Sequence, residues 1–141
     1  MAASPADGSA IFVDTSGFYA FLDGTDPFHL AARDGFQLAV RERRQLVCTN
    51  YVLHESQAVI QGRLGWEAVD AFLDRLVPLC EVVWVDGRLH DLGVARCRQA
   101  RERRLSLTDC VSIETMRRRG ITAAIAADDH FAREGFTMPR P

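Results

Sequence analysis

Lysine and long hydrophobic runs are both absent from this sequence of 141 residues. No run approaches the roughly 20 apolar residues that a membrane-spanning helix needs. The first ten residues also lack the basic start and the apolar stretch of a secretory signal. These absences predict that the protein does not span a membrane, and they favour a cytoplasmic location.

Signatures of several common chemistries are missing as well. There is no C-x-x-C pair and no histidine at zinc-finger spacing. Neither Gly-rich phosphate loop, G-x-x-x-x-G-K-S/T or G-x-G-x-x-G, is present, nor is the G-x-S-x-G nucleophile elbow. His54 and Glu55 lack the second histidine of the zinc-protease helix. Because their neighbours are mostly apolar, we expect buried reduced thiols at Cys48, Cys80, Cys97 and Cys110.

All 17 basic residues are arginines, and many lie in three clusters at residues 41–44, 101–104 and 117–119. The net charge of −2 does not suggest a nucleic-acid-binding protein, because contacts with backbone phosphates need clustered cations. The clusters allow two interpretations: solvated helix ends near a favourable dipole, or phosphate contacts. Both interpretations remain open from the sequence.

The order of apolar runs predicts one α/β domain at residues 10–141, after a flexible leader at residues 1–9. Short runs typical of buried strands lie at residues 11–13, 46–48, 82–85 and 121–126, with a possible last strand near 136–138. Helical periodicity lies between them, at residues 28–43, 51–63, 66–76, 89–103 and 107–119, and another helix begins near Ser16. This alternation implies a parallel sheet covered by helices.

Four acidic residues fall where such a fold would bring them to one edge. Asp14 and Asp128 follow predicted strands, whereas Glu55 and Asp109 lie early in predicted helices. In α/β units helices begin where strands end, so all four acids point to the rim where such sheets bind ligands.

Each acid also has an ordinary structural explanation. Asp14 is a good helix cap, Asp109 could form a capping box with Ser106, and Glu55 could lie on a solvated flank. Asp128 could begin a turn with Asp129. Together, however, they need compensation, since two carboxylates 5 Å apart repel by about 3 kcal/mol at an effective dielectric near 20. Mg²⁺ is the natural cation, and Mn²⁺ could substitute, because both prefer carboxylate oxygens.

The motifs around these acids resemble the PIN-domain ribonucleases, and among them the VapC-like toxins of toxin–antitoxin pairs. They lie at residues 12–16 (FVDTS), 49–55 (TNYVLHE), 105–110 (LSLTDC) and 127–131 (ADDHF), followed by Gly135 and Phe136. The resemblance implies a three-layer α/β/α fold with a parallel sheet of four to five strands in the order 3-2-1-4-5. It also implies a homodimer and an antitoxin that inserts a segment into the acidic groove.

By the same resemblance the four acids are catalytic metal ligands, and Ser16 and Thr108 are polar supports. Asp14 and Asp109 would be the principal ligands, Glu55 would complete the site and could accept a proton from water, and Asp128 would hold a second ion or orient that water. Asp129 could replace or assist Asp128, although the His-Phe pair that follows favours Asp128.

The expected function is therefore Mg²⁺-dependent hydrolysis of RNA phosphodiester bonds by a toxin that inhibits translation or growth. Two alternatives remain. One is a housekeeping RNA-processing nuclease without an antitoxin, and the other is a PIN interaction module without catalysis.

Overall fold

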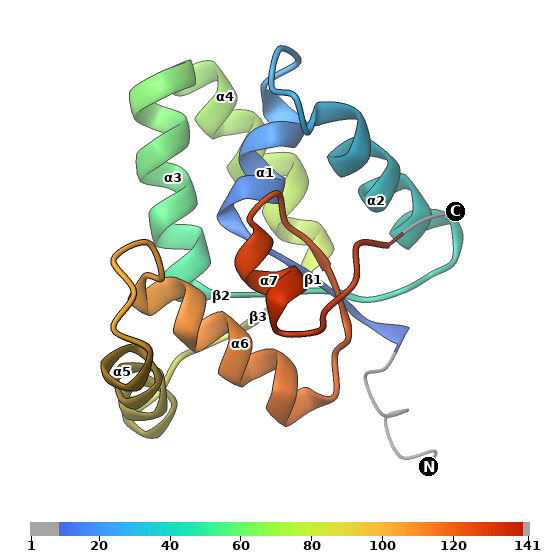
Figure 1. Cartoon of the computed structure of the whole chain (residues 1–141). Coiled ribbons are helices and arrows are strands. Elements are labelled where there is room, and N and C mark those ends of the chain that lie inside the picture. Colours follow the sequence, from blue (N-terminus) through green and yellow to red (C-terminus); the bar gives the residue numbers. More distant parts are fainter. Residues whose placement is uncertain (1–8, 140–141) are drawn as a thin grey trace.

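A four-stranded, fully parallel sheet forms the centre of the computed structural model, which describes residues 9–139 (Figure 1). The strands are β1 (Ile11–Val13), β2 (Leu46–Thr49), β3 (Cys80–Val83) and β4 (Ala123–Ile125), in the order β3-β2-β1-β4. Every residue of β1, β2 and β4 is buried. Such continuous apolar runs are typical of parallel strands covered on both faces, and the predicted α/β class and strand order are confirmed.

Helices connect the strands in the predicted order and form the two outer layers. Those before β3 are α1 (Thr15–Leu22), α2 (His29–Arg41), α3 (Asn50–Leu64), α4 (Trp66–Ala71), the π-helical segment η2 (Phe72–Leu76) and the 3₁₀ turn η3 (Val77–Leu79). Those after β3 are α5 (Gly87–Ala100), α6 (Leu107–Arg119) and α7 (Asp129–Arg133). Because parallel crossovers are right-handed and the strand order reverses after β3, α1–α4 lie on one face and α5 and α6 on the other (Figure 1).

The close approach of α1 to β4 depends on Gly17. A Cβ atom added there would lie 2.3 Å from the carbonyl oxygen of Ile125, far inside contact distance. The backbone N–H of Asp14 also donates to that carbonyl oxygen, at 3.1 Å. The end of β1 is therefore fixed beside the end of β4, at the point where the strand order changes direction. Ligand sites of open α/β sheets are found at such points.

Several boundaries differ from the predictions. For example, α5 was expected at residues 89–103 and lies at Gly87–Ala100, and β4 is Ala123–Ile125 instead of residues 121–126. The apolar run at residues 82–85 predicted β3 two residues too far along the chain. The strand β2 ends at Thr49, where α3 begins, and Thr49 pairs with Val83, so β3 has no partner beyond Val83. The predicted last strand is reduced to one parallel bridge between Ala123 and Thr137, beside β4, where the fifth strand was expected. The helix predicted at residues 66–76 changes to π-helical geometry at Phe72.

Several smaller expectations concern the ends and the thiols. The predicted leader lies outside the described residues except for Ser9, whose carbonyl oxygen accepts a hydrogen bond from Arg44 at 2.5 Å. Between residues 9 and 139, no helix is both long and apolar enough to cross a membrane. All four cysteines are free, as expected. The expectation of burial is wrong for Cys80 and Cys97, which are partly exposed because they lie at the sheet edge and on the outer helix α5.

Candidate metal centre

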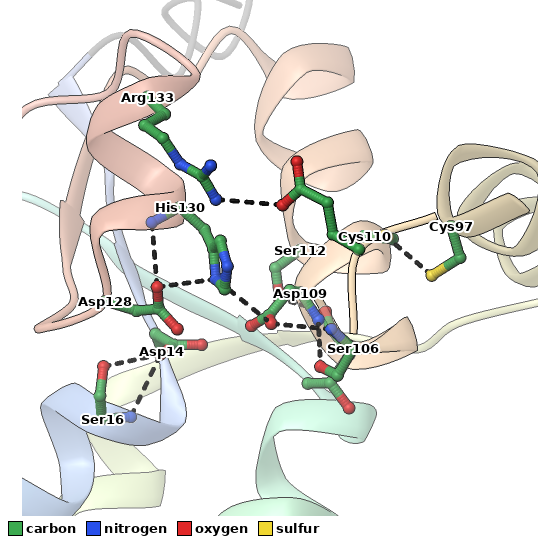
Figure 2. Close-up of polar contacts among 12 residues, drawn as sticks. Asp14, Ser16, Cys97, Ser106, Asp109, Cys110, Ser112, Asp128, His130 and Arg133 are labelled. Carbon is green, nitrogen blue, oxygen red and sulfur yellow. Dashed lines mark hydrogen bonds and ion pairs between the residues drawn. The ribbon is translucent and has the colours of Figure 1, made fainter. Parts of the chain in front are cut away.

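A cleft of about 410 Å³ at the carboxyl ends of the strands is lined by all four predicted acids. They reach it from four segments: the end of β1, α3, the first turn of α6 and the loop after β4. Figure 2 shows three of them, Asp14, Asp109 and Asp128, turned toward one another. The convergence expected from topology is therefore present in the structure.

Asp14 is buried and uses only one of its two carboxylate oxygens. Oδ2 accepts the backbone N–H of Ser16 at 3.2 Å and its hydroxyl at 2.7 Å, which caps α1. Oδ1 is buried and has no hydrogen-bond partner. Burial, followed by the negative charge of Asp109, raises the pKa of Asp14 to about 7 against the opposing bonds from Ser16. A buried carboxylate oxygen without a partner is uncommon, and it needs a cation or a proton.

Asp109 is also buried and belongs to a capping box with Ser106. Its Oδ2 accepts the Ser106 N–H at 3.0 Å, while the Ser106 hydroxyl oxygen accepts the Asp109 N–H at 3.1 Å. Burial raises the pKa of Asp109, and the charge of Asp128 adds to this, while the bonds from Ser106 oppose it. The capping role and a place in the site are thus compatible.

Asp128 caps the short helix α7 and contacts a histidine that was not assigned to the site from the sequence. Its Oδ1 accepts the backbone N–H of His130 at 2.9 Å. The ring Nδ1 of the buried His130 lies 2.7 Å from the same oxygen and 3.8 Å from Oδ2 of Asp109, but without the alignment of a hydrogen bond (Figure 2). One ligand atom from each of these three residues lies within 4.8 Å of the others, close enough for one ion.

Glu55 is half-buried on α3, in the row of Val52 and Val59 as expected, and Val59 lines the cleft with it. Its negative charge contributes to the raised pKa values of both Asp14 and Asp109. The helix is fixed behind it, because the buried Ser56 hydroxyl donates to Thr15 at 3.3 Å. Glu55 therefore faces the two buried acids from across the cleft.

The two predicted supports take different places. Ser16 donates to Asp14 and accepts the backbone N–H of Ala127 at 2.9 Å, so it ties the α1 cap to the loop after β4. Thr108 lines an adjacent hollow instead of the acidic cleft. Asp129 is exposed and does not line the cleft, whereas Asp128 does.

Two arginines on the cleft wall were not assigned from the sequence. Arg104 comes from the cluster at residues 101–104, and Arg63 lies in the last turn of α3, with its guanidinium 5.6 Å from the ring centre of Tyr19. Tyr19 and Asp26 line the cleft as well. The acidic floor thus has cations at its border, which suits a phosphodiester ligand.

The donor set fits a hard divalent cation. Carboxylate oxygens dominate, Oδ1 of Asp14 lacks a partner, and the pKa values of two acids are raised by burial and mutual repulsion. Mg²⁺ and Mn²⁺ prefer oxygen ligands and keep open positions for phosphate oxygens and water. Asp109, Asp128 and His130 lie close enough together to hold one such ion, and Asp14 and Glu55 line the same cleft.

The chain is similar to known proteins along most of its length. Residues 11–136 match the model of the PIN domain. The chain is 32% identical over 132 residues to the 23S rRNA-specific endonuclease VapC20 of two Mycobacterium tuberculosis strains, CDC 1551 / Oshkosh and ATCC 25618 / H37Rv, which covers 93% of this chain and 98% of the relative. The crystal structure of M. tuberculosis VapC20, described as a sarcin-ricin loop cleaving toxin, superimposes with a TM-score of 0.80 over 94% of this chain and 100% of that one.

Proposed function

We propose that this chain, which belongs to the PIN-domain family, is a divalent-metal-dependent endoribonuclease and the toxin of a toxin–antitoxin pair. The observation that carries the proposal is the convergence of the four predicted carboxylates on one cleft, with Oδ1 of Asp14 buried and without a partner. Such a group is costly in a folded protein unless a cation balances it. The similarity of the chain to VapC20 favours a toxin over a housekeeping nuclease.

We assign Asp14 and Asp109 as the principal ligands of Mg²⁺, for which Mn²⁺ would substitute. Glu55 would complete the site or accept a proton from the attacking water, and Asp128 would hold a second ion or orient that water. PIN nucleases generally depend on divalent metals, and such an ion, when bound, lowers the pKa of water and offsets charge on the leaving oxygen.

Neighbouring residues would keep these ligands in place. Ser16 fixes one oxygen of Asp14 and leaves the other for the ion, and Ser106 does the same for Oδ2 of Asp109. The backbone N–H of His130 holds Asp128 in place as the N-cap of α7. Such partners of metal ligands restrict their orientation. Arg63 and Arg104 would bind the backbone phosphates on either side of the cleavage point.

For the substrate we propose ribosomal RNA, on the basis of the activity for which VapC20 is named. The antitoxin would occupy the acidic cleft and so keep RNA out until it is removed. We also propose that the protein works as a cytoplasmic homodimer. Sedimentation of the purified chain, with and without its antitoxin, would test this assembly.

The central experiment compares Asp14→Asn with Asp91→Asn, a matched change at an exposed aspartate on α5. Loss of a partner of a metal ligand reduces activity about ten- to a hundredfold, so loss of a ligand should reduce Mg²⁺-dependent RNA cleavage by at least about a hundredfold. The Asp91→Asn variant should cleave like the wild type. Equal cleavage by both variants would show that the acidic cleft is not the catalytic site.

A second measurement separates a nuclease from a non-catalytic PIN module. A ligand that binds the native state raises the melting temperature by mass action. Millimolar Mg²⁺ or Mn²⁺ should therefore raise the melting temperature of the wild type and leave that of Asp14→Asn almost unchanged. Absence of a shift in the wild type would favour the non-catalytic module.

A further inference from the structure

A second hollow, of about 550 Å³, adjoins the acidic cleft on the same rim of the sheet. It is lined by Asn50, Tyr51, Leu53, His54, Trp84 and Thr108, and is named here the Trp84 hollow. Two helices pass from one hollow to the other. His54 faces the Trp84 hollow while Glu55 faces the cleft, and Thr108 and Asp109 are divided in the same way. The two hollows therefore share walls formed by α3 and α6, which pack together (Figure 1).

Trp84 presents a large apolar surface to solvent at the end of β3. The residue is 73% exposed, the highest value among the large apolar residues that the structure describes. The chain on its carboxyl side is nevertheless fixed. The Val85 N–H donates to Oδ1 of Asn50 at 2.7 Å, and Asp86 caps α5 by accepting the Leu89 N–H at 2.9 Å. The indole is thus held on a well-anchored turn, and its exposure does not come from a loose segment.

The remaining walls combine one more aromatic ring with polar groups. The Tyr51 hydroxyl lies 2.5 Å from Nδ1 of His90, and the two rings meet edge to face at a centroid distance of 5.9 Å and an angle of 73°. This contact fixes the Tyr51 ring. Asn50, His54 and Thr108 add groups that can donate or accept hydrogen bonds. The hollow is therefore flat-sided and aromatic, but it is not purely apolar.

We propose that the Trp84 hollow binds an unpaired RNA base next to the phosphate held in the acidic cleft, with the base stacked on the indole. The proposal rests on the proposed ribonuclease function. Proteins recognise RNA sequence mainly at unpaired bases, which stack on aromatic side chains and expose their edges for hydrogen bonds. A base is uncharged, so it can lie beside carboxylates that repel the phosphates.

The position of the hollow favours RNA over a protein segment as its occupant. A phosphodiester that binds at the acids must place the adjoining nucleotide somewhere along the same rim, and the Trp84 hollow opens there. On the other side of Trp84 a further hollow contains the exposed Arg118, so a strand passing the indole would meet a cation. The substrate class is accordingly a loop or single strand, and a continuous duplex is excluded.

Fluorescence can test the contact directly, because the chain has only two tryptophans. In the Trp66→Phe variant Trp84 is the sole tryptophan, the acidic cleft is unchanged, and phosphorothioate linkages in the RNA slow its cleavage during the measurement. An RNA hairpin with an unpaired loop, added with Mg²⁺, should quench its emission, whereas a fully paired duplex of the same length should not. The matched variant Trp84→Phe reports from Trp66, which is 58% exposed near the far end of α3, about 20 Å along that helix, and should show no quenching.

Cleavage kinetics give an independent readout. Alanine substitution of a stacking aromatic weakens binding about 5- to 150-fold per base, so Trp84→Ala should raise KM for the hairpin within that range and change kcat less. Trp84→Phe should restore most of the binding, and Trp66→Ala should leave KM unchanged. Equal KM values for Trp84→Ala and Trp66→Ala, with no quenching by the hairpin, would overturn the proposal.

Other outcomes are equally decisive. If Trp84→Ala changes the sedimentation of the protein or its binding to an antitoxin, while RNA quenches neither tryptophan, the hollow is a protein interface and the proposal is wrong. If the wild type cleaves no RNA with Mg²⁺ or Mn²⁺, the proposed function fails, and the quenching experiment still decides whether Trp84 binds a base.

Discussion

Replacing Asp14 by asparagine should change how the stability of the metal-free protein depends on pH. The pKa of Asp14 is raised from 3.8 to about 7 in the folded protein, mainly by burial and then by Asp109. The native state therefore binds this proton more tightly than the unfolded chain does. Stability should fall as pH rises from about 4 to about 7 and then remain low, because above pH 7 the native carboxylate is charged without a partner for Oδ1.

The size of the effect follows from the shift. One pKa unit corresponds to about 1.4 kcal/mol, so the raised pKa of Asp14 makes the free energy of unfolding about 4 kcal/mol lower at pH 8 than at pH 4. Asparagine is a good helix cap and can still accept the Ser16 N–H, but it cannot ionise. Its buried amide costs about 1–3 kcal/mol if unpaired, at every pH. The pH slope, not the absolute stability, is thus the informative quantity.

The assay is denaturant unfolding of both proteins in EDTA between pH 4 and 8. The wild type should lose stability relative to Asp14→Asn by several kcal/mol across this range. Some slope should persist in the variant, because burial also raises the pKa of Asp109. Adding Mg²⁺ at pH 8 should recover most of the wild-type loss and have little effect on the variant. If the free energy of unfolding depends on pH in the same way for both proteins in EDTA, the charged form of Asp14 does not destabilise the native state and the reasoning is refuted.

Three further predictions concern neighbouring positions. Asp128→Asn should reduce Mg²⁺-dependent cleavage by at least about tenfold, while Asp129→Asn, at the adjacent exposed acid outside the cleft, should not; equal losses would reassign the fourth acid. Gly17→Ala should destabilise the protein by about 2 kcal/mol or more in thermal unfolding, because its Cβ would clash with the backbone of β4, and an unchanged melting temperature would contradict that close approach. Arg104→Gln should weaken binding of uncleaved RNA and lower the slope of log affinity against log salt by about one; an unchanged slope would remove Arg104 from the phosphate contacts.

The rim of acids could be predicted because it depends on robust features. Short apolar runs ending in an acid predict strand ends, and the parallel topology brings those ends together without any knowledge of side-chain contacts. The boundaries of β1 and α6 were predicted correctly for the same reason. The predicted places of Asp14 and Asp109 required only those two boundaries.

The missed residues depend on local conformations with no periodic signal. His130 approaches Asp128 and Asp109 because Asp128 caps a helix of only five residues, and so short a helix shows no periodicity. Arg104 lines the cleft because Arg101 ends α5 in the left-handed conformation, with φ 52°, and redirects the chain. For a residue other than glycine this conformation is uncommon, and no pattern in the sequence predicts it.

The capping explanations and the site explanations for the acids turn out to describe the same geometry. Asp14 and Asp128 are N-caps, and Asp109 closes the capping box of α6, so three carboxylates lie at helix N-termini on one rim. The positive ends of those helix dipoles offset part of the mutual repulsion, and the caps fix the orientation of each carboxylate. For Asp14 the hydrogen bonds occupy one oxygen and direct the other into the protein without a partner. The fold can therefore assemble the acids without a cation, and the repulsion that remains would favour the binding of one.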